Sequence, residues 1–243
     1  MQMIHGLLFI NLQAGKKMKI LFLGTGAADW PAERPADAKE HRRLSSALID
    51  DTLLIDPNQC VFDALKEYGK EPAKIKYIIN THPHSDHYCE ETVKELEKSG
   101  AVFIPFYAGD EKTVGKYTVR AYAANHSTAD LPVHFIVSDG AKTLFYGLDG
   151  AWLLYGEVQA IKQYRPDLAV LDATVGFIDG DYRIFEHNDL YMVLEMKKSL
   201  EKYIGTFCIS HMARTLHQDH KALSEKMNGY GVITAYDGME YEL

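Results

Sequence analysis

Three histidines and one aspartate stand within six positions of each other in "IINTHPHSDHYCEET", residues 78–92. They follow a run that reads as a buried strand, and crowded imidazoles repel one another once protonated. His82 and His84 are two positions apart and can point the same way, while Asp86 and His87 are expected in the first turn of the next helix. This spacing constrains the fold, because four polar side chains must converge at one strand-to-helix corner.

A metal centre is the chemistry that best explains this cluster. Neutral imidazole nitrogens and carboxylate oxygens suit zinc, manganese or iron. Four such groups exceed what one metal with an open coordination position needs, so the stretch predicts two metals. A lone histidine would more often be a hydrogen-bonded loop residue.

Composition narrows the class of protein. The chain has 243 residues, of which 47% are hydrophobic, so it can bury a sizeable core. Its formal charge of -8 argues against general nucleic-acid binding, which needs a clustered surplus of Lys and Arg. Cys60, Cys89 and Cys208 are widely separated and form no CxxC motif, so we expect no disulfide framework and a cytoplasmic location.

The N-terminus raises a separate question. Residues 1–17 contain an apolar stretch, but they lack the basic region and the cleavage site of a signal peptide. The stretch is also far shorter than the roughly 20 apolar residues of a membrane helix. Because Met18 begins "MKILFLGTGAA", we expect residues 1–17 to be an extension and residues 18–243 to form a single domain without membrane association.

Periodicity and turn residues predict alternating strands and helices and hence one α/β domain. The expected strands are residues 19–23, 47–49, 53–55, 75–79, 117–123, 133–137, 143–146, 168–171, 207–209 and 232–235. The expected helices are residues 60–68, 86–98, 154–164, 188–203 and 217–227, with Ser85 as a candidate cap for the second.

Three further polar residues directly follow predicted strands. His126 comes after "TVRAYAAN", Asp149 after "TLFYGL" and His211 after "TFCIS". Strand ends are where open α/β sheets gather ligands. Each residue alone is commonplace, since a strand-end aspartate is usually a turn residue. Together they provide the additional ligands that two metals require.

The segments "THPHSDH", "NHST", "GLDG", "ISH" and "AYDGMEYEL" together resemble the metallo-β-lactamase superfamily from about Met18 onwards. Within it the chain is most similar to the phosphodiesterase branch, which includes ribonuclease Z and a phosphoribosyl cyclic phosphodiesterase. The resemblance implies an αββα sandwich with two divalent metal ions, zinc or manganese first and iron as a further candidate. It implies that His82, His84 and His126 hold one metal, that Asp86, His87 and His211 hold the other, and that Asp149 bridges both.

The branch assignment rests on residues outside this ligand set. "EHNDL" places His187 and Asp189 where similar enzymes carry a histidine near the leaving group, although His187 alone could simply begin a helix. We therefore take His187, together with Asp86, as the candidate catalytic residues. His217 is a second candidate for substrate binding or equally a surface histidine, and Asp172 either orients a metal-bound imidazole or occupies a turn.

These assignments predict hydrolysis of small or cyclic phosphodiesters by a metal-activated hydroxide, with His187 donating a proton to the leaving oxygen. The stretch "DWPAERPADAKEHRR" has no cysteine, so the structural zinc of the cyclic phosphodiesterase is not expected. We also find no long basic insertion that could bind tRNA, which favours small substrates. An acyl or thioester hydrolase and a non-catalytic metal-binding protein remain alternatives, and the resemblance also allows a homodimer.

Overall fold

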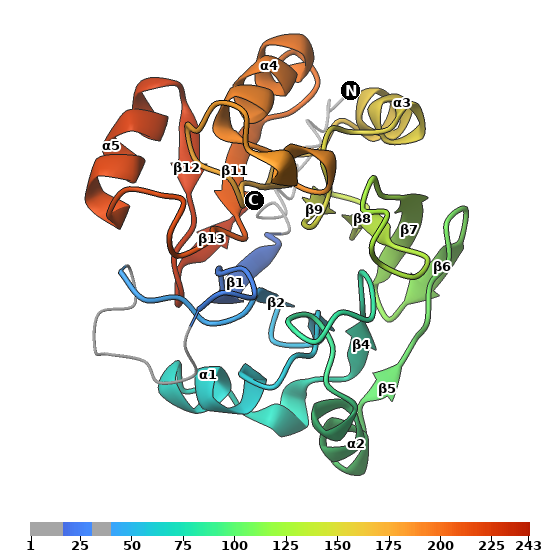
Figure 1. Ribbon diagram of the computed structural model, residues 1–243. Coiled ribbons are helices and arrows are strands. Elements are labelled where there is room, and N and C mark those ends of the chain that lie inside the picture. The colour runs from blue at the N-terminus through green and yellow to red at the C-terminus, as the bar shows by residue number, and fades with distance from the viewer. Residues whose placement is uncertain (1–16, 31–39) are drawn as a thin grey trace, which may run out of the picture.

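The computed structural model describes residues 17–30 and 40–243, which form two stacked β-sheets (Figure 1). Residues 1–16 of the expected N-terminal extension lie outside the described residues, and the boundary at Met18 stays a prediction. No helix within the described ranges is both long and apolar enough to cross a membrane.

The first sheet comes mainly from the N-terminal half of the chain. Its strands, in spatial order, are β13 (Glu240–Glu242), β1 (Lys19–Gly24), β2 (Ser46–Ile49), β3 (Leu53–Ile55), β4 (Tyr77–Ile79) and β5 (Val102–Phe103). Strands β3, β4 and β5 run parallel and the other neighbours are antiparallel. The 3₁₀ turn η1 (Pro72–Lys74) leads into β4, and α1 (Val61–Glu67) and α2 (Glu90–Lys98) follow β3 and β4.

The second sheet contains the remaining strands. In spatial order they are β12 (Val232–Thr234), β11 (Thr206–Ser210), β10 (Leu168–Asp172), β9 (Thr143–Gly147), β8 (Val133–Ser138), β7 (Tyr117–Ala123) and β6 (Glu111–Val114). Strands β6 to β9 form an antiparallel meander, and β9 to β12 are parallel. The parallel strands are connected through α3 (Tyr155–Tyr164), α4 (Leu190–Leu200), which follows the 3₁₀ turn η2 (Tyr182–Phe185), and α5 (His220–Gly229).

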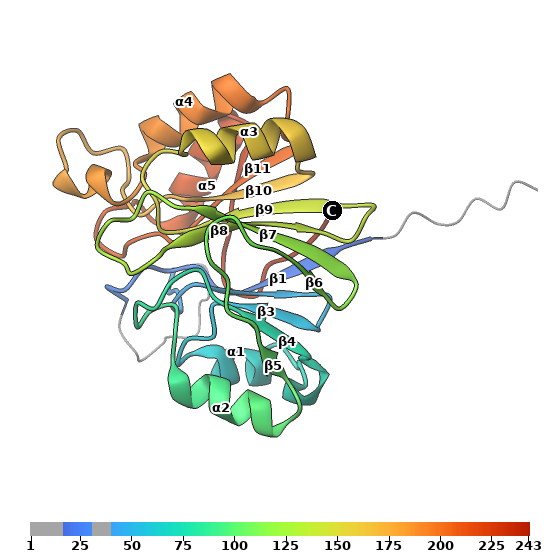
Figure 2. The same ribbon diagram turned by 90° about the vertical axis from the view of Figure 1, so that its right-hand side faces the viewer.

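Figure 2 shows the layers from the side, with α1 and α2 below the first sheet and α3, α4 and α5 above the second. Phe22, Phe135 and Tyr146 belong to the core between the sheets, and separate clusters pack each sheet against its helices. All five residues of β10, "LAVLD", are buried because both faces of this strand are covered. This architecture confirms the predicted αββα sandwich.

The predicted helix over residues 86–98 is four residues too long at its start. The helix begins at Glu90 after Cys89, which is held extended while its N–H donates to the Pro57 carbonyl. Asp86 and His87 therefore lie in a turn before the helix, and the residue at the helix N-cap is Cys89 rather than Ser85. The short strands β5, β6 and β13 were not predicted, because edge strands of two to four residues leave little periodicity to detect.

Candidate dinuclear metal centre

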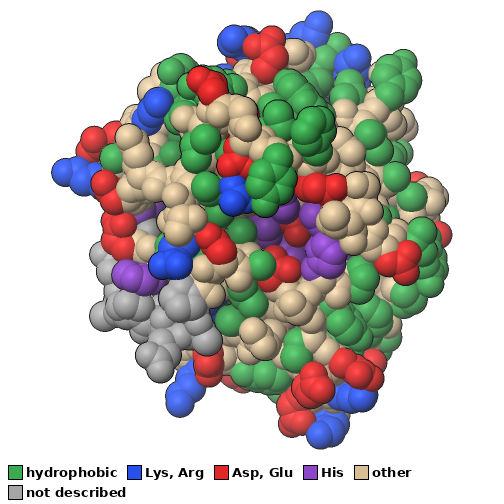
Figure 3. Space-filling view, viewed as in Figure 1, with side chains coloured by type: hydrophobic (Ala, Val, Ile, Leu, Met, Phe, Trp, Pro, Cys, Tyr) green, Lys and Arg blue, Asp and Glu red, His purple; other side chains and the backbone are tan. Residues whose placement is uncertain are grey.

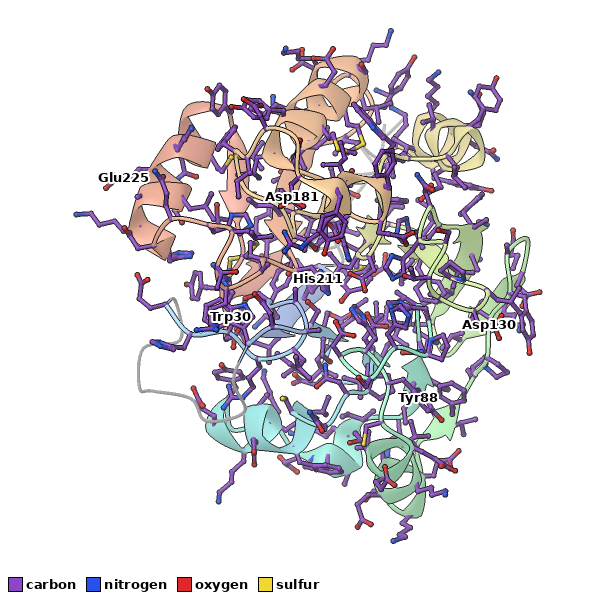
Figure 4. The ribbon with its side chains drawn as sticks, in the orientation of Figure 1. Trp30, Tyr88, Asp130, Asp181, His211 and Glu225 are labelled. Atoms are coloured by element: carbon purple, nitrogen blue, oxygen red, sulfur yellow. The ribbon has the colours of Figure 1, made fainter. Side chains whose placement is uncertain are left out.

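The seven predicted ligands come from four separate loops and meet at one edge of the sandwich. His82, His84, Asp86 and His87 lie between β4 and α2, His126 follows β7, Asp149 follows β9, and His211 follows β11. In Figure 4 the labelled His211 lies near the middle of this edge. Figure 3 shows histidine side chains gathered in a hollow on the same face.

The first group of ligand atoms belongs to His82, His84, His126 and Asp149, and these atoms lie within 4.8 Å of one another. His82 Nε2 is 3.0 Å from Asp149 Oδ2. His84 Nδ1 is 3.2 Å from His126 Nε2. Three imidazoles and one carboxylate oxygen thus face a single point.

The second group comprises Asp86, His87, Asp149 and His211, again within 4.8 Å. His87 Nε2 is 3.1 Å from His211 Nε2. His211 Nε2 also lies 2.9 Å from Asp149 Oδ1 and 3.4 Å from Asp86 Oδ2. Asp149 belongs to both groups, so its carboxylate lies where a ligand bridging two ions would lie.

In each ring of the first group, the nitrogen that points away from the metal position makes a hydrogen bond. This bond determines whether the other nitrogen, which points inward, carries a lone pair. His84 Nε2 donates to the Thr128 carbonyl at 3.3 Å, and His126 Nδ1 donates to the Glu186 carbonyl at 3.1 Å. A carbonyl can only accept, so the inner nitrogens of both neutral rings carry lone pairs. Two lone pairs 3.2 Å apart are unfavourable unless a cation lies between them.

The second group is oriented in the same way by side chains. His87 Nδ1 lies 2.9 Å from the carboxylate oxygen Oδ2 of Asp56, and His211 Nδ1 lies 2.8 Å from Thr174 Oγ1. Asp56 is fully buried. Such outer partners orient metal-binding histidines and make them better ligands.

Two inner atoms, His82 Nε2 and Asp149 Oδ1, are among the buried polar atoms of the described residues that make no well-directed hydrogen bond, although they lie 3.0 Å from Asp149 Oδ2 and 2.9 Å from His211 Nε2 respectively. Buried polar atoms in folded proteins are nearly always paired. Because both atoms belong to the ligand groups, and because the donors are imidazoles and carboxylates, the residues fit two divalent cations such as zinc or manganese.

The two groups differ in how they bind protons. Burial and the neighbouring His87 lower the pKa of His82 to about 4, and burial lowers the pKa of His126. Burial also disfavours charge on His87, but the carboxylates of Asp149 and Asp56 together outweigh burial and raise the pKa of His87 to about 10. The pKa of His211 is likewise raised, with burial opposed chiefly by Asp149. His82 and His126 are therefore ready to bind metal as neutral imidazoles, whereas His87 and His211 must first lose protons.

His187 borders this centre without belonging to either group. Its Nδ1 lies 3.1 Å from Asp172 Oδ2, and its ring stacks on that of His211 at 5.7 Å between centroids. Burial lowers the pKa of His187, and the carboxylate of Asp172 more than offsets this, so the net shift is upwards. His187 Nδ1 also lies in a third cluster with Asp149, Asp172 and His211, but it is the nitrogen directed at Asp172.

Asp172 orients side chains and also caps a turn. Besides contacting His187, its carboxylate accepts hydrogen bonds from the Thr174 hydroxyl at 3.0 Å and from the Asn188 N–H at 3.0 Å. Asp189 caps α4, since its side chain accepts from the Met192 N–H at 2.7 Å.

His217 lies apart from the ligand groups. Its Nε2 is 2.7 Å from the Ala173 carbonyl and 3.1 Å from the Thr174 carbonyl, so it supports the backbone behind Thr174. His217 is half-buried, lies three residues before α5 and is absent from the described lining of the metal cavity, so a role in substrate binding stays a prediction.

A cavity of about 280 Å³ opens over the ligands. Its described lining includes His84, Asp86, His187 and one basic side chain of the Lys and Arg type, Arg183. The Arg183 guanidinium is 2.5 Å from Asp181 and is 37% exposed. The described lining of the hollow therefore supplies little positive charge of its own.

Sequence reasoning missed Asp56, Thr174, Arg183 and Glu186. Glu186 accepts hydrogen bonds from Ser127 at 2.5 Å and from the Thr128 N–H at 3.1 Å, so it ties the loop before α4 to the loop that carries His126. Asp56 was detectable, because it directly follows β3 as Asp149 follows the β9 region. Thr174 and Glu186 lie in "LDAT" and "EHNDL", two segments that resemble the phosphodiesterase branch, but no role was predicted for either residue, and Arg183 carried no such signal.

Comparison with known proteins gives partial matches in sequence. The family model of the metallo-β-lactamase superfamily matches residues 45–90, which include the HxHxDH motif. A glucose-1-phosphate adenylyltransferase of Clostridium botulinum is 29% identical over 114 residues, which make up 46% of this chain but only 30% of that enzyme. The chain thus matches less than a third of the length of this curated relative.

Solved structures extend the likeness over almost the whole chain. A diphosphatase from the PhnP family superposes with a TM-score of 0.73 at 14% identity, covering 94% of this chain and 98% of that one. The metallo-β-lactamase fold protein YhfI of Bacillus subtilis gives 0.72 at 18% identity, covering 94% and 100%. The short form of human tRNase Z gives 0.65 at 17% identity, covering 92% and 98%. At these identities the likeness establishes the fold.

Proposed function

We propose that this chain is a member of the metallo-β-lactamase superfamily and a dinuclear metal-dependent phosphodiesterase acting on small or cyclic phosphodiesters. The observation that carries the proposal is the carboxylate of Asp149 between two ligand groups, with the His187–Asp172 pair at their border. A diphosphatase and a tRNase Z are among the structurally similar proteins, which agrees with phosphate-ester chemistry.

His82, His84 and His126 would hold one ion, Asp86, His87 and His211 the other, and Asp149 both. When bound, two divalent ions supply a hydroxide nucleophile near neutral pH and neutralise charge on the phosphoryl oxygens. The chain's contribution is to orient these ligands through Asp56, Thr174 and backbone carbonyls.

His187 is the proposed proton donor. Nδ1 is directed at Asp172, so Nε2 is the ring nitrogen available to the cavity that His187 lines. The raised pKa keeps the ring protonated to higher pH than usual, as a general acid requires. During reaction the Nε2 proton would pass to the departing alkoxide while Asp172 holds the ring.

The sparse positive charge of the cavity favours diesters over monoesters. A phosphomonoester carries an additional negative charge, and Arg183, the basic residue of the described lining, is already paired with Asp181. A diester monoanion meets less repulsion from Asp29 and Asp86, which also line the cavity.

The test is a substrate panel with the metal-loaded protein. We expect bis-p-nitrophenyl phosphate to be hydrolysed faster than p-nitrophenyl phosphate and faster than p-nitrophenyl acetate or a thioester. The first three compounds release the same leaving group, p-nitrophenolate. Differences between their rates therefore report whether the protein prefers a phosphodiester, a phosphomonoester or a carboxylic ester. Faster turnover of the monoester would refute the diester preference, and turnover of the carbonyl substrates alone would indicate an acyl or thioester hydrolase.

A further inference from the structure

A buried histidine–glutamate pair lies beneath the proposed bridging ligand. His134 of β8 is 1% exposed and Glu157 of α3 is 0% exposed, and His134 Nδ1 lies 2.5 Å from Glu157 Oε1. Neither residue belongs to a ligand group or to the described lining of the cavity.

Every polar atom of this pair is engaged. His134 Nε2 donates to the Leu148 carbonyl at 3.0 Å, and Glu157 Oε2 accepts from the Leu154 N–H at 2.7 Å. Both bonds reach the segment that joins β9 to α3. Leu148 immediately precedes Asp149, so the imidazole holds the peptide that leads into the bridging carboxylate.

The backbone at this point needs such support. Asp149 has a φ of 56°, in the left-handed region that residues other than glycine adopt at a cost. Its N–H donates to Asp172 at 3.2 Å on one side. On the other side the His134 ring packs so closely that a Cβ on Gly150 would lie 2.7 Å from it.

Burying a charged pair is costly, and an apolar pair of similar volume would fill this space at lower cost. Packing alone therefore does not explain why a histidine and a glutamate occupy this position. We propose that His134 and Glu157 are a positioning pair, which holds the backbone of Asp149 so that its two carboxylate oxygens face both metal positions. This inference rests on the proposed dinuclear centre.

The inference predicts that losing the pair weakens both metal positions, because each uses one oxygen of Asp149. Glu157→Ala and His134→Phe should each lower the affinity for Mn²⁺ at both positions, by about tenfold for a residue that orients a ligand. The exchange coupling between two bound Mn²⁺ ions in electron paramagnetic resonance spectra should also change, since it depends on the bridge.

Glu157→Gln is the conservative variant that distinguishes position from charge. Its amide N–H can donate to His134 Nδ1 and its carbonyl can accept from the Leu154 N–H, so His134 Nε2 still donates to the Leu148 carbonyl. We expect wild-type coupling and affinity from it. Should Glu157→Ala not fold, Glu157→Asp, one methylene shorter, should show the same loss in milder form.

Tyr117→Phe is a matched control, because the buried Tyr117 hydroxyl donates to Asp50 at 2.7 Å, at the opposite end of β7 from the loop that carries His126. It should lower stability without changing the Mn²⁺ coupling. Wild-type metal binding in Glu157→Ala and His134→Phe would overturn the inference, as would an equal loss in Glu157→Gln. Failure of the wild type to bind two ions would instead refute the dinuclear centre.

Discussion

Replacing Asp56 by asparagine should weaken one metal position selectively, because it reverses the tautomer of a single ligand. Oδ1 of Asp56 accepts from the Thr81 N–H at 2.8 Å and from the Thr81 hydroxyl at 2.9 Å, while Oδ2 faces His87 Nδ1 at 2.9 Å. A backbone N–H can only donate, so the amide oxygen of an asparagine must take the Thr81 side. Its NH₂ group then faces His87 Nδ1.

Two donors cannot share this contact. His87 must move its proton from Nδ1 to Nε2, the nitrogen that faces the second metal position, or leave the contact altogether. Either response removes a ligand lone pair. Substitution of an outer partner of a metal-binding histidine typically costs 10-fold to 100-fold in affinity, which corresponds to about 1.4 to 2.7 kcal/mol. We expect a loss of about this size at the second position and little change at the first.

Competition between the protein and a chelating dye for Zn²⁺ or Co²⁺ resolves the two affinities. Asp237→Asn is the control, since Asp237 is also buried and accepts hydrogen bonds from Thr25 at 2.8 Å and from the Arg43 N–H at 2.6 Å, neither of which is a proposed metal ligand. It should reduce stability but leave both metal affinities intact. Unchanged binding of both ions by Asp56→Asn would show that the Asp56 contact does not control the His87 tautomer.

Three further outcomes are expected. Asp149→Ala should reduce metal affinity at both positions, whereas His126→Ala should mainly reduce metal affinity at the first position. Elemental analysis that finds a single ion in the loaded wild type would contradict the dinuclear centre. His187→Ala should slow diesters with alkyl leaving groups by roughly 10² to 10⁴ but p-nitrophenyl esters far less, with metal content unchanged; loss of an ion would make His187 a ligand. Because His87 and His211 have raised pKa values in the metal-free protein, binding at the second position should release protons and weaken as pH falls from about 8 to about 6, and calorimetry in buffers of different ionisation enthalpy should detect these protons.

The sequence predicted the metal site best where several ligands are close together in the chain or directly follow a strand. The HxHxDH motif packs four donors into one loop, and its alternative explanations are few. His126, Asp149 and His211 were individually weak, yet all follow strands of the second sheet, and strand order brings them to one edge. The αββα fold was predicted through its resemblance and confirmed by the two sheets.

What the sequence could not supply were partners that depend on the packing of distant segments. His134 and Glu157 are 23 positions apart, and a histidine within "VHFIVS" has no pattern that separates it from an ordinary core residue. Asp56 and His87 are 31 positions apart and meet only because β3 and β4 are parallel neighbours. The start of α2 was misplaced for a similar reason, since a contact with Pro57 keeps Cys89 extended.

The backbone at the centre shows why such partners are necessary. Asp56, Asp149 and His211 have φ values of 60°, 56° and 61°, and each stands just after a strand or a few residues beyond one. Glycine would adopt this conformation without strain, but it has no side chain that could bind a metal or orient a ligand. An aspartate or histidine at such a position costs of order 1 to 3 kcal/mol. Local sequence preference alone would not hold these turns. They persist because the Asp56 N–H bonds to Ile79 and the Asp149 N–H bonds to Asp172, and because His211 Nδ1 is held by Thr174. At these three positions the strain falls on residues that hold or orient the proposed metal ions, and the surrounding contacts that offset it determine whether the carboxylates and imidazoles converge.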